Sequence, residues 1–78
     1  MIGLNLVFIT NMTKQQRYVL NSMKNGYTLA ELKLSDIIKL YNGNHSEKIN
    51  KKIVAALLEK HLIIKVLHDG SYNTFELI

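Results

Sequence analysis

The residues with the clearest potential for chemistry are three lysines in the second half of the chain. Lys48, Lys51 and Lys52 lie close together in the sequence, and in a helix they would share the face opposite the apolar positions. Ammonium groups on one face can neutralise phosphates. The formal net charge of +4 also favours an anionic partner. Solvated lysine faces are nevertheless common in soluble proteins, so charge alone indicates a class of partner without identifying it.

Other chemistries find little support in the residue types and their spacing. The chain has no cysteine, which excludes disulfides, thiolate zinc sites and a cysteine nucleophile. His45, His61 and His68 are widely spaced and form no i, i+4 pair, so we predict no metal site. The carboxylates show no pairing typical of acid–base catalysis, and the isolated glycines form no phosphate-binding loop. We therefore predict a protein that is not an enzyme and requires no cofactor.

Length and composition indicate one small globular domain. The chain has 78 residues, of which 47% are hydrophobic and 21% charged, as in ordinary folded proteins. A chain this short buries only about 60–65% of its unfolded surface, which favours a homodimer. The absence of cysteine, of a signal peptide and of a membrane-spanning segment predicts a cytoplasmic protein with no membrane association.

The first twelve residues are predicted to be separate from the domain that follows. Their alternating apolar residues are typical of a strand, namely Ile2, Leu4, Leu6 and Phe8. Met12 is an alternative start, in which case the first eleven residues would be a poorly ordered extension. We therefore divide the chain into an N-terminal segment, residues 1–12, and a domain, residues 13–78.

Capping signals and apolar spacing predict three helices in the domain. Thr13 and Gln16 form a capping box for a helix over residues 13–24, and Asn25-Gly26 ends it. Residues 27–32 fit either a short helix or a strand, and we prefer the strand. Ser35 can cap a second helix that ends at Asn42-Gly43. A third helix over residues 44–61 would direct four apolar side chains inward, which are Ile49, Ile53, Ala56 and Leu57.

From Leu62 the apolar period changes to two, which is typical of strands. Asp69-Gly70 can form a two-residue hairpin turn. That turn would place Ile64 opposite Phe75 and Leu62 opposite Leu77 on a core-facing side. The other side would carry Lys65, Leu67, Tyr72 and Thr74.

The stretch Val54-Ala55-Ala56-Leu57-Leu58-Glu59-Lys60-His61-Leu62-Ile63, followed by Asp69-Gly70, resembles the third helix and wing of the winged helix-turn-helix family. The resemblance covers residues 13–78. It is to small members of the family that act as regulators in phages or mobile elements. It implies an α+β fold with three helices, a C-terminal β-hairpin wing and a short extra strand. The chain departs from the family at His61, where glycine is common, and at the wing tip, which has no lysine or arginine.

The resemblance also implies how the chain would bind DNA. The helix over residues 44–61 would enter the major groove. Ser46 and Asn50 would contact base edges, the three lysines would contact phosphates, and the small Ala55 would allow close approach. Additional contacts would come from Lys14, Arg17, Lys65 and Tyr72.

Two functions remain open from the sequence. The first is binding of duplex DNA, sequence-specific or architectural, by a small homodimeric transcriptional regulator. The alternative is a protein-interaction module that uses a hairpin face with Ile63, Leu67 and Tyr72, or the N-terminal strand, because a fold does not settle function. Stacking of single-stranded bases on tyrosines is disfavoured, because core or helix-packing positions suit Tyr18, Tyr27 and Tyr41.

Overall fold

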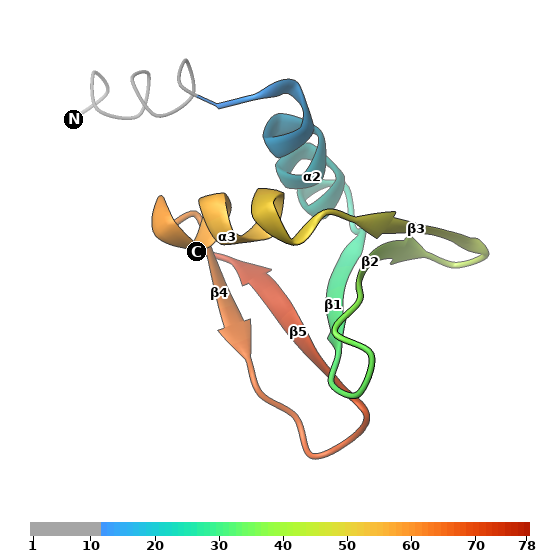
Figure 1. Ribbon diagram of the computed structural model, residues 1–78. Helices are drawn as coiled ribbons and strands as arrows, with labels where there is room; N and C mark the ends of the chain where they lie inside the picture. The colour runs from blue at the N-terminus through green and yellow to red at the C-terminus, as the bar shows by residue number, and fades with distance from the viewer. Residues whose placement is uncertain (1–11) are drawn as a thin grey trace.

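The computed structural model describes residues 12–78, which form two helices packed against one face of an antiparallel five-stranded sheet (Figure 1). The elements are α2 (Lys14–Lys24), β1 (Thr28–Leu32), β2 (Ile38–Asn42), β3 (His45–Ile49), α3 (Lys51–Glu59), β4 (Ile63–Val66) and β5 (Tyr72–Leu77). The strand order across the sheet is β3-β2-β1-β5-β4. The predicted α+β class is confirmed. The winged helix-turn-helix architecture is wrong, because it requires three helices and the described residues form two.

Helix α2 begins and ends where the sequence predicts. The Thr13 side chain accepts a hydrogen bond from the Gln16 backbone N–H at 3.1 Å, and the Gln16 side chain accepts one from the Thr13 N–H at 3.2 Å. This capping box satisfies two backbone donors that a helix start leaves free. The helix buries Val19, Leu20 and Met23 on one side. The strand predicted for residues 1–12 lies outside the described residues, except for Met12, which is buried.

Strand β1 lies at the centre of the sheet and confirms the strand that we preferred for residues 27–32. It pairs with β2 on one side and with β5 on the other, so Leu29 lies between Leu40 and Phe75. All three side chains are buried in the core under the helices. The centre of the sheet therefore joins segments that are far apart in the sequence.

The second predicted helix is wrong, because a β-hairpin of β2 and β3 occupies that region. Ile38 and Leu40 are buried, while Lys39 between them is exposed, which is the period of a strand. Gly43 and Asn44 form a two-residue loop between the paired residues Asn42 and His45. Gly43 has a φ of +58°, which suits glycine at the start of such a loop.

The apolar positions explain why the helix prediction failed there. A helix starting at Ser35 would have placed Leu34 with Ile37 and Ile38 on a core face, whereas Leu34 is 100% exposed. As a strand, the same segment places Ile38 and Leu40 beside β1 and leaves Leu34 in the loop. Burial of these side chains beside the central strand stabilises the fold by more than a local helix cap at Ser35 would.

The third predicted helix is only partly correct, because residues 45–49 form β3 and helix α3 starts later. Asn50 caps α3, and its side chain accepts a hydrogen bond from the Lys52 N–H at 2.8 Å. The helix buries Val54 and Leu57, whereas Ile53 and Ala56 are only half-buried. Ile49 is also buried, but it belongs to β3, where it lies opposite Ile38. The inward face predicted for a continuous helix is therefore divided between a strand and a shorter helix.

The end of α3 uses His61 as the left-handed residue that often closes a helix. His61 has a φ of 59°. Its N–H bonds to the Leu58 carbonyl at 3.0 Å, and the Leu62 N–H bonds to the Leu57 carbonyl at 3.1 Å. These two bonds form a Schellman motif, in which glycine is the usual residue at this position. The chain then turns directly into β4.

The C-terminal hairpin is present, but its predicted register is wrong by one residue on β4. Lys65, not Ile64, lies opposite Phe75, and Ile63 lies opposite Leu77. Residues 67–71 form a longer loop than the predicted two-residue turn. The shift exchanges the faces of β4, so Ile63 is 1% exposed and Ile64 is 48% exposed.

The Asn73 and Thr74 side chains help to hold this longer loop. The Asn73 side-chain oxygen accepts a hydrogen bond from the His68 N–H at 3.1 Å, and the His68 ring lies 2.8 Å from the Thr74 hydroxyl. The Ser71 carbonyl also accepts a bond from the Lys33 N–H at 3.0 Å. The loop is therefore tied both to its own hairpin and to the loop that follows β1.

Candidate nucleic-acid interface

The sheet has one face covered by the two helices and one face that they leave uncovered (Figure 1). The uncovered face, here called the open face, follows from the strand pairing and from the alternation of side chains along each strand. Its side chains are Thr28, Ala30, Leu32, Lys39, Tyr41, Ser46, Lys48, Ile64, Val66, Tyr72, Thr74 and Glu76. Lysine and tyrosine are combined there with small and apolar residues.

Two lysines of the open face lie directly opposite each other. Lys39 of β2 pairs with Lys48 of β3, and both residues are exposed. Among residues 12–78 neither has a carboxylate within ion-pair distance, since the ion pairs there involve His45, Lys51 and Lys65. Like charges opposite each other in a sheet are destabilising. This pair therefore concentrates positive charge at the β2–β3 side of the open face.

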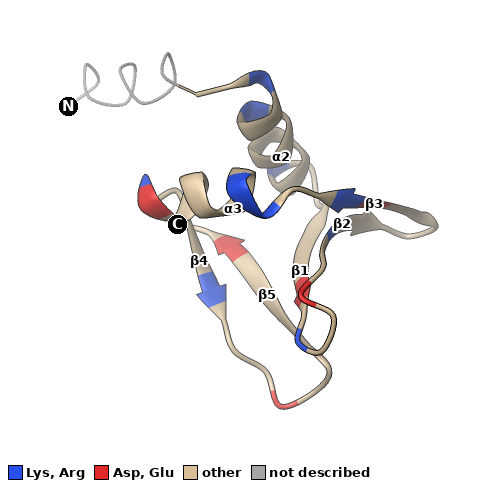
Figure 2. Ribbon diagram, viewed as in Figure 1, with Lys and Arg blue, Asp and Glu red and all other residues tan. Residues whose placement is uncertain are grey.

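Two further lysines continue this charge onto the first turn of α3. Lys51 and Lys52 follow directly after β3 and the Asn50 cap. Figure 2 shows the lysines of β2, β3 and the start of α3 next to one another. Lys51 forms an ion pair with Asp36, whereas Lys52 forms none within the described residues. We call Lys39, Lys48, Lys51 and Lys52 the lysine surface.

A hollow lies where the loop after β1 meets the start of α3. Its volume is about 610 Å³, and it extends between Asp36, Lys48 and Lys52. The positive end of the α3 dipole lies at this point, which favours negative charge. The Asp36 carboxylate occupies part of this favourable region through its contact with Lys51. An external anion would therefore compete with Asp36 for Lys51 but not for Lys48 or Lys52.

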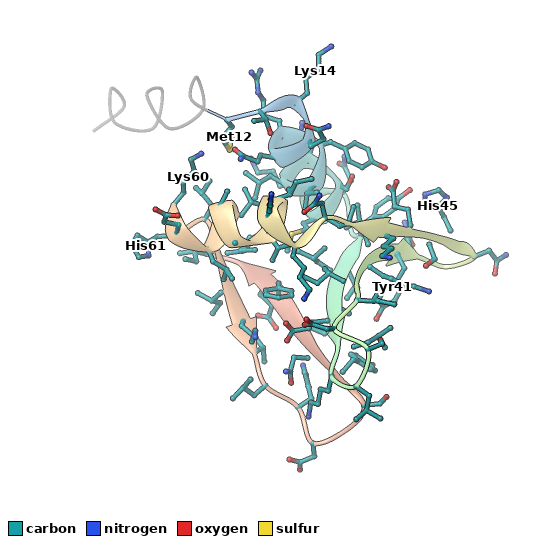
Figure 3. The ribbon with its side chains drawn as sticks, viewed as in Figure 1. Met12, Lys14, Tyr41, His45, Lys60 and His61 are labelled. Atoms are coloured by element: carbon teal, nitrogen blue, oxygen red, sulfur yellow. The ribbon has the colours of Figure 1, made fainter. Side chains whose placement is uncertain are left out.

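Two tyrosines border a smaller hollow on the open face. Its volume is about 220 Å³, and its lining consists of Ala30, Leu32, Lys39, Tyr41 and Tyr72. Tyr72 is 41% exposed and Tyr41 is half-buried. In Figure 3, Tyr41 and His45 point to opposite sides of the β2–β3 hairpin. The lysine surface and an aromatic hollow thus share Lys39.

Lys65, on the helix-covered face, has a carboxylate partner, unlike Lys39 and Lys48 within the described residues. Lys65 lies 3.0 Å from the Glu31 carboxylate, and its ammonium lies 5.9 Å from the centre of the Phe75 ring. The Asn73 amide also donates to Glu31, at 3.5 Å. The hydrogen bond from Lys65 lowers the pKa of Glu31 below its ordinary value, although partial burial acts in the opposite direction. This lysine has a structural partner.

The α2 side of the β2–β3 hairpin is also held by polar contacts. The Tyr18 hydroxyl donates a hydrogen bond to the Glu47 carboxylate, and this bond raises the pKa of Tyr18 above its ordinary value. His45 lies 3.8 Å from the same carboxylate and makes an edge contact with Tyr27. Glu47 is therefore engaged on the helix-covered side, away from Lys39 and Lys48.

The structure brings together part of the site that the sequence predicted. The predicted residues near the β3–α3 junction are Ser46, Lys48, Asn50, Lys51, Lys52 and, one turn later on α3, the exposed Ala55. They do not lie on one helix, because Ser46 and Lys48 belong to β3. Asn50 caps α3, so its side-chain oxygen is already engaged in a hydrogen bond.

Four other predicted residues lie elsewhere. Lys14 and Arg17 lie at the start of α2, and Figure 3 shows Lys14 far from Tyr41. The Arg17 guanidinium donates to the Met12 carbonyl at 3.2 Å. Lys65 is paired with Glu31 on the helix-covered face, whereas Tyr72 lies on the open face. The proposed hairpin face with Ile63 is also wrong, because Ile63 is buried.

Sequence reasoning missed Lys39 and the position of Tyr41 on the open face. Both were placed in the second predicted helix, where Tyr41 was assigned to packing. The alternation of Ile38 and Leu40 with Lys39 and Tyr41, followed by Asn42-Gly43, is a signal for a strand and a hairpin turn. That pattern would have placed Lys39 and Tyr41 on the same face.

Within residues 12–78, no helix is both long and apolar enough to cross a membrane. The same residues contain no group of three or more metal-ligating side chains placed to hold an ion. Comparisons with protein-family models, curated proteins and solved structures found no match to this chain.

Proposed function

We propose that the protein binds nucleic acid by contacting phosphates with the lysine surface. The observation that carries this proposal is the cross-strand pair Lys39 and Lys48, which has no carboxylate partner among the described residues. Two ammonium groups opposite each other repel. A phosphate chain relieves this repulsion and releases its own counterions.

The neighbouring residues support the same ligand. Lys52, which forms no ion pair within residues 12–78, adds a third ammonium, and the start of α3 adds the positive end of a helix dipole. Phosphate contacts of this kind give affinity and orientation but carry no sequence information. Duplex DNA and a role in transcriptional regulation remain predictions that require binding to be measured first.

Salt dependence of binding tests the proposal. For a protein bound to duplex DNA, each phosphate contact contributes about −0.9 to the slope of log affinity against log salt. Lys39, Lys48 and Lys52 therefore predict a slope of roughly −2.7. The double substitution Lys39→Gln and Lys48→Gln should weaken binding for all sequences and reduce the slope by about 1 per lysine. Fluorescence anisotropy over a series of salt concentrations measures both effects.

The matched control is Lys14→Gln with Lys24→Gln. Both lysines are exposed on α2, so this variant has the same net charge as the test variant but retains the lysine surface. It should bind nearly as the parent does. Equal losses in the two double variants would mean that net charge, and not this surface, causes binding. Absence of binding by the parent at low salt would refute the proposal outright.

A further inference from the structure

We infer that the open face takes single-stranded nucleic acid, with unpaired bases stacking on Tyr41 and Tyr72 and phosphates held by Lys39 and Lys48. This inference rests on the proposed function and specifies the type of strand. Aromatic rings beside lysines on an open surface are the usual components of a single-strand site, because every base has a face that can stack. The hollow between the two tyrosines contains both components.

The small side chain of Ala30 gives the hollow its floor. Ala30 lies on the central strand, paired with Lys39 of β2 and with Thr74 of β5. Tyr41 lies opposite Thr28, and Tyr72 lies opposite Leu32. The two rings therefore lie on opposite sides of Ala30, diagonally across β1. A larger side chain at Ala30 would fill the space between them.

The spacing of the tyrosines sets the length of strand that the site can engage. Tyr41 is on β2 and Tyr72 on β5, which are two strand spacings apart, or about 9–10 Å. They are also displaced along β1 by the distance from Thr28 to Leu32, or roughly 13 Å. Bases stacked on the two rings are consequently not neighbours in the strand, and the site spans several nucleotides.

The width of the open face argues against reading of a duplex. Five strands spaced by about 4.8 Å form a surface roughly 19 Å wide. The major groove is only about 12 Å wide and accommodates a helix or a two-stranded ribbon. Base faces inside a duplex are also covered by their neighbours, so neither tyrosine could stack on them. Duplex DNA could contact the lysines but not the tyrosines.

Charge on the open face favours a nucleic acid over a protein partner. Among the described residues, the open face carries one carboxylate, that of Glu76 on β5. Glu76 lies opposite Ile64 of β4, at the end of the sheet away from β2 and β3. Lys39 lines the tyrosine hollow, and Lys48 is its cross-strand partner. A ligand that covers the tyrosines must therefore neutralise positive charge at the same time, which phosphates do.

Binding to matched ligands tests this inference. We would measure anisotropy with a labelled oligothymidine of about 12 nucleotides and with a duplex of the same length, at about 50 mM salt. We expect the single strand to bind at least about tenfold more tightly. Tyr41→Leu and Tyr72→Leu should each weaken single-strand binding roughly 5- to 50-fold. Tyr41→Phe and Tyr72→Phe, which keep the ring, should bind as the parent does.

Tyr18→Leu is the matched control, because Tyr18 is an exposed tyrosine on α2 outside the open face, and its bond to Glu47 lies on the helix-covered side of β3. It should leave single-strand affinity unchanged. Circular dichroism of each variant checks the fold. If a leucine variant does not fold, NMR titration of the parent with the oligothymidine decides instead. We expect the signals of Ala30, Leu32, Tyr41 and Tyr72 to shift, and shifts confined to α2 would overturn the inference.

The outcomes separate this inference from the proposed function. Equal or tighter binding of the duplex that still depends on Lys39 and Lys48 would overturn the single-strand inference and leave the proposed function standing. Leucine variants that bind the single strand like the parent would have the same effect. If neither ligand binds, both fail, and a protein becomes the partner to seek for the open face.

Discussion

The two faces of the sheet place lysines in opposite situations. On the helix-covered face, Lys65 is 3.0 Å from Glu31 and packs over Phe75, so its charge is matched within the fold. On the open face, Lys39 and Lys48 lie opposite each other with no carboxylate beside them in the described part of the chain. The first arrangement contributes to stability, whereas the second opposes it and suits a negatively charged ligand.

The largest expected effect tests which face holds the core. Leu40 is fully buried on the helix-covered side of β2, and its neighbour Tyr41 lies on the open face. Leu40→Ala should lower the free energy of unfolding by about 2–5 kcal/mol, because it leaves a cavity. Tyr41→Leu should cost less than about 1 kcal/mol, as is usual for substitutions outside the core. Urea unfolding measures both, and similar costs would contradict the division between the faces.

A smaller effect tests the ion pair between Lys65 and Glu31 on the helix-covered face. Glu31→Gln removes the charge that Lys65 contacts and should cost about 0.5–1 kcal/mol at neutral pH, since the pair is partly exposed to solvent. The pKa of Glu31 is lower in the folded state than its ordinary value. On acidification, Glu31 therefore binds a proton in the unfolded chain before it does so in the folded one. The stability contributed by the Glu31–Lys65 ion pair is lost as the pH falls through the folded-state pKa.

The pH dependence provides the control for that substitution. Urea unfolding of the parent and of Glu31→Gln should differ at pH values above the ordinary glutamate range and converge well below it. A difference that stays constant on acidification would mean that Glu31 acts by packing and not by charge. The stability of Glu31→Gln itself should depend less on pH than that of the parent.

The smallest expected effect has the opposite sign and concerns the unmatched lysines. In the absence of a ligand, Lys39→Gln with Lys48→Gln should raise the free energy of unfolding by about 0.2–0.5 kcal/mol, because it removes like charges from a cross-strand pair. The gain should shrink at high salt as the repulsion is screened. Thermal unfolding at low and high salt measures it. A loss of stability would show that these lysines already have favourable contacts.

Local signals in the sequence were sufficient for the first part of the domain. The Thr13 and Gln16 capping box and the Asn25-Gly26 stop act within a few residues, so α2 could be predicted. The β4–β5 hairpin was predicted for a similar reason, because its alternation is local. The register of the hairpin was not predicted. It depends on which residue of β4 pairs with the buried Phe75 and on the hydrogen bonds of the loop at residues 67–71.

The middle of the chain shows where local signals mislead. Ser35 and Asn44 each resemble a helix cap, yet the segments that follow them form β2 and β3. Ile38 and Leu40 are buried because β1 accepts a partner strand, and β1 in turn is held by β5 from the end of the chain. A choice that depends on such distant pairing is not visible in a short window of residues.

The lysines and tyrosines were visible from the start. The lysines indicated an anionic partner, whereas the sequence disfavoured stacking of bases on the tyrosines. Their arrangement was decided by the tertiary structure. Strand pairing placed Lys39 opposite Lys48, put Tyr41 and Tyr72 on either side of Ala30, and directed Lys65 to Glu31 on the other face. The physical reason is that side chains alternate along a strand, so the face of each residue is settled only when its strand finds its partners.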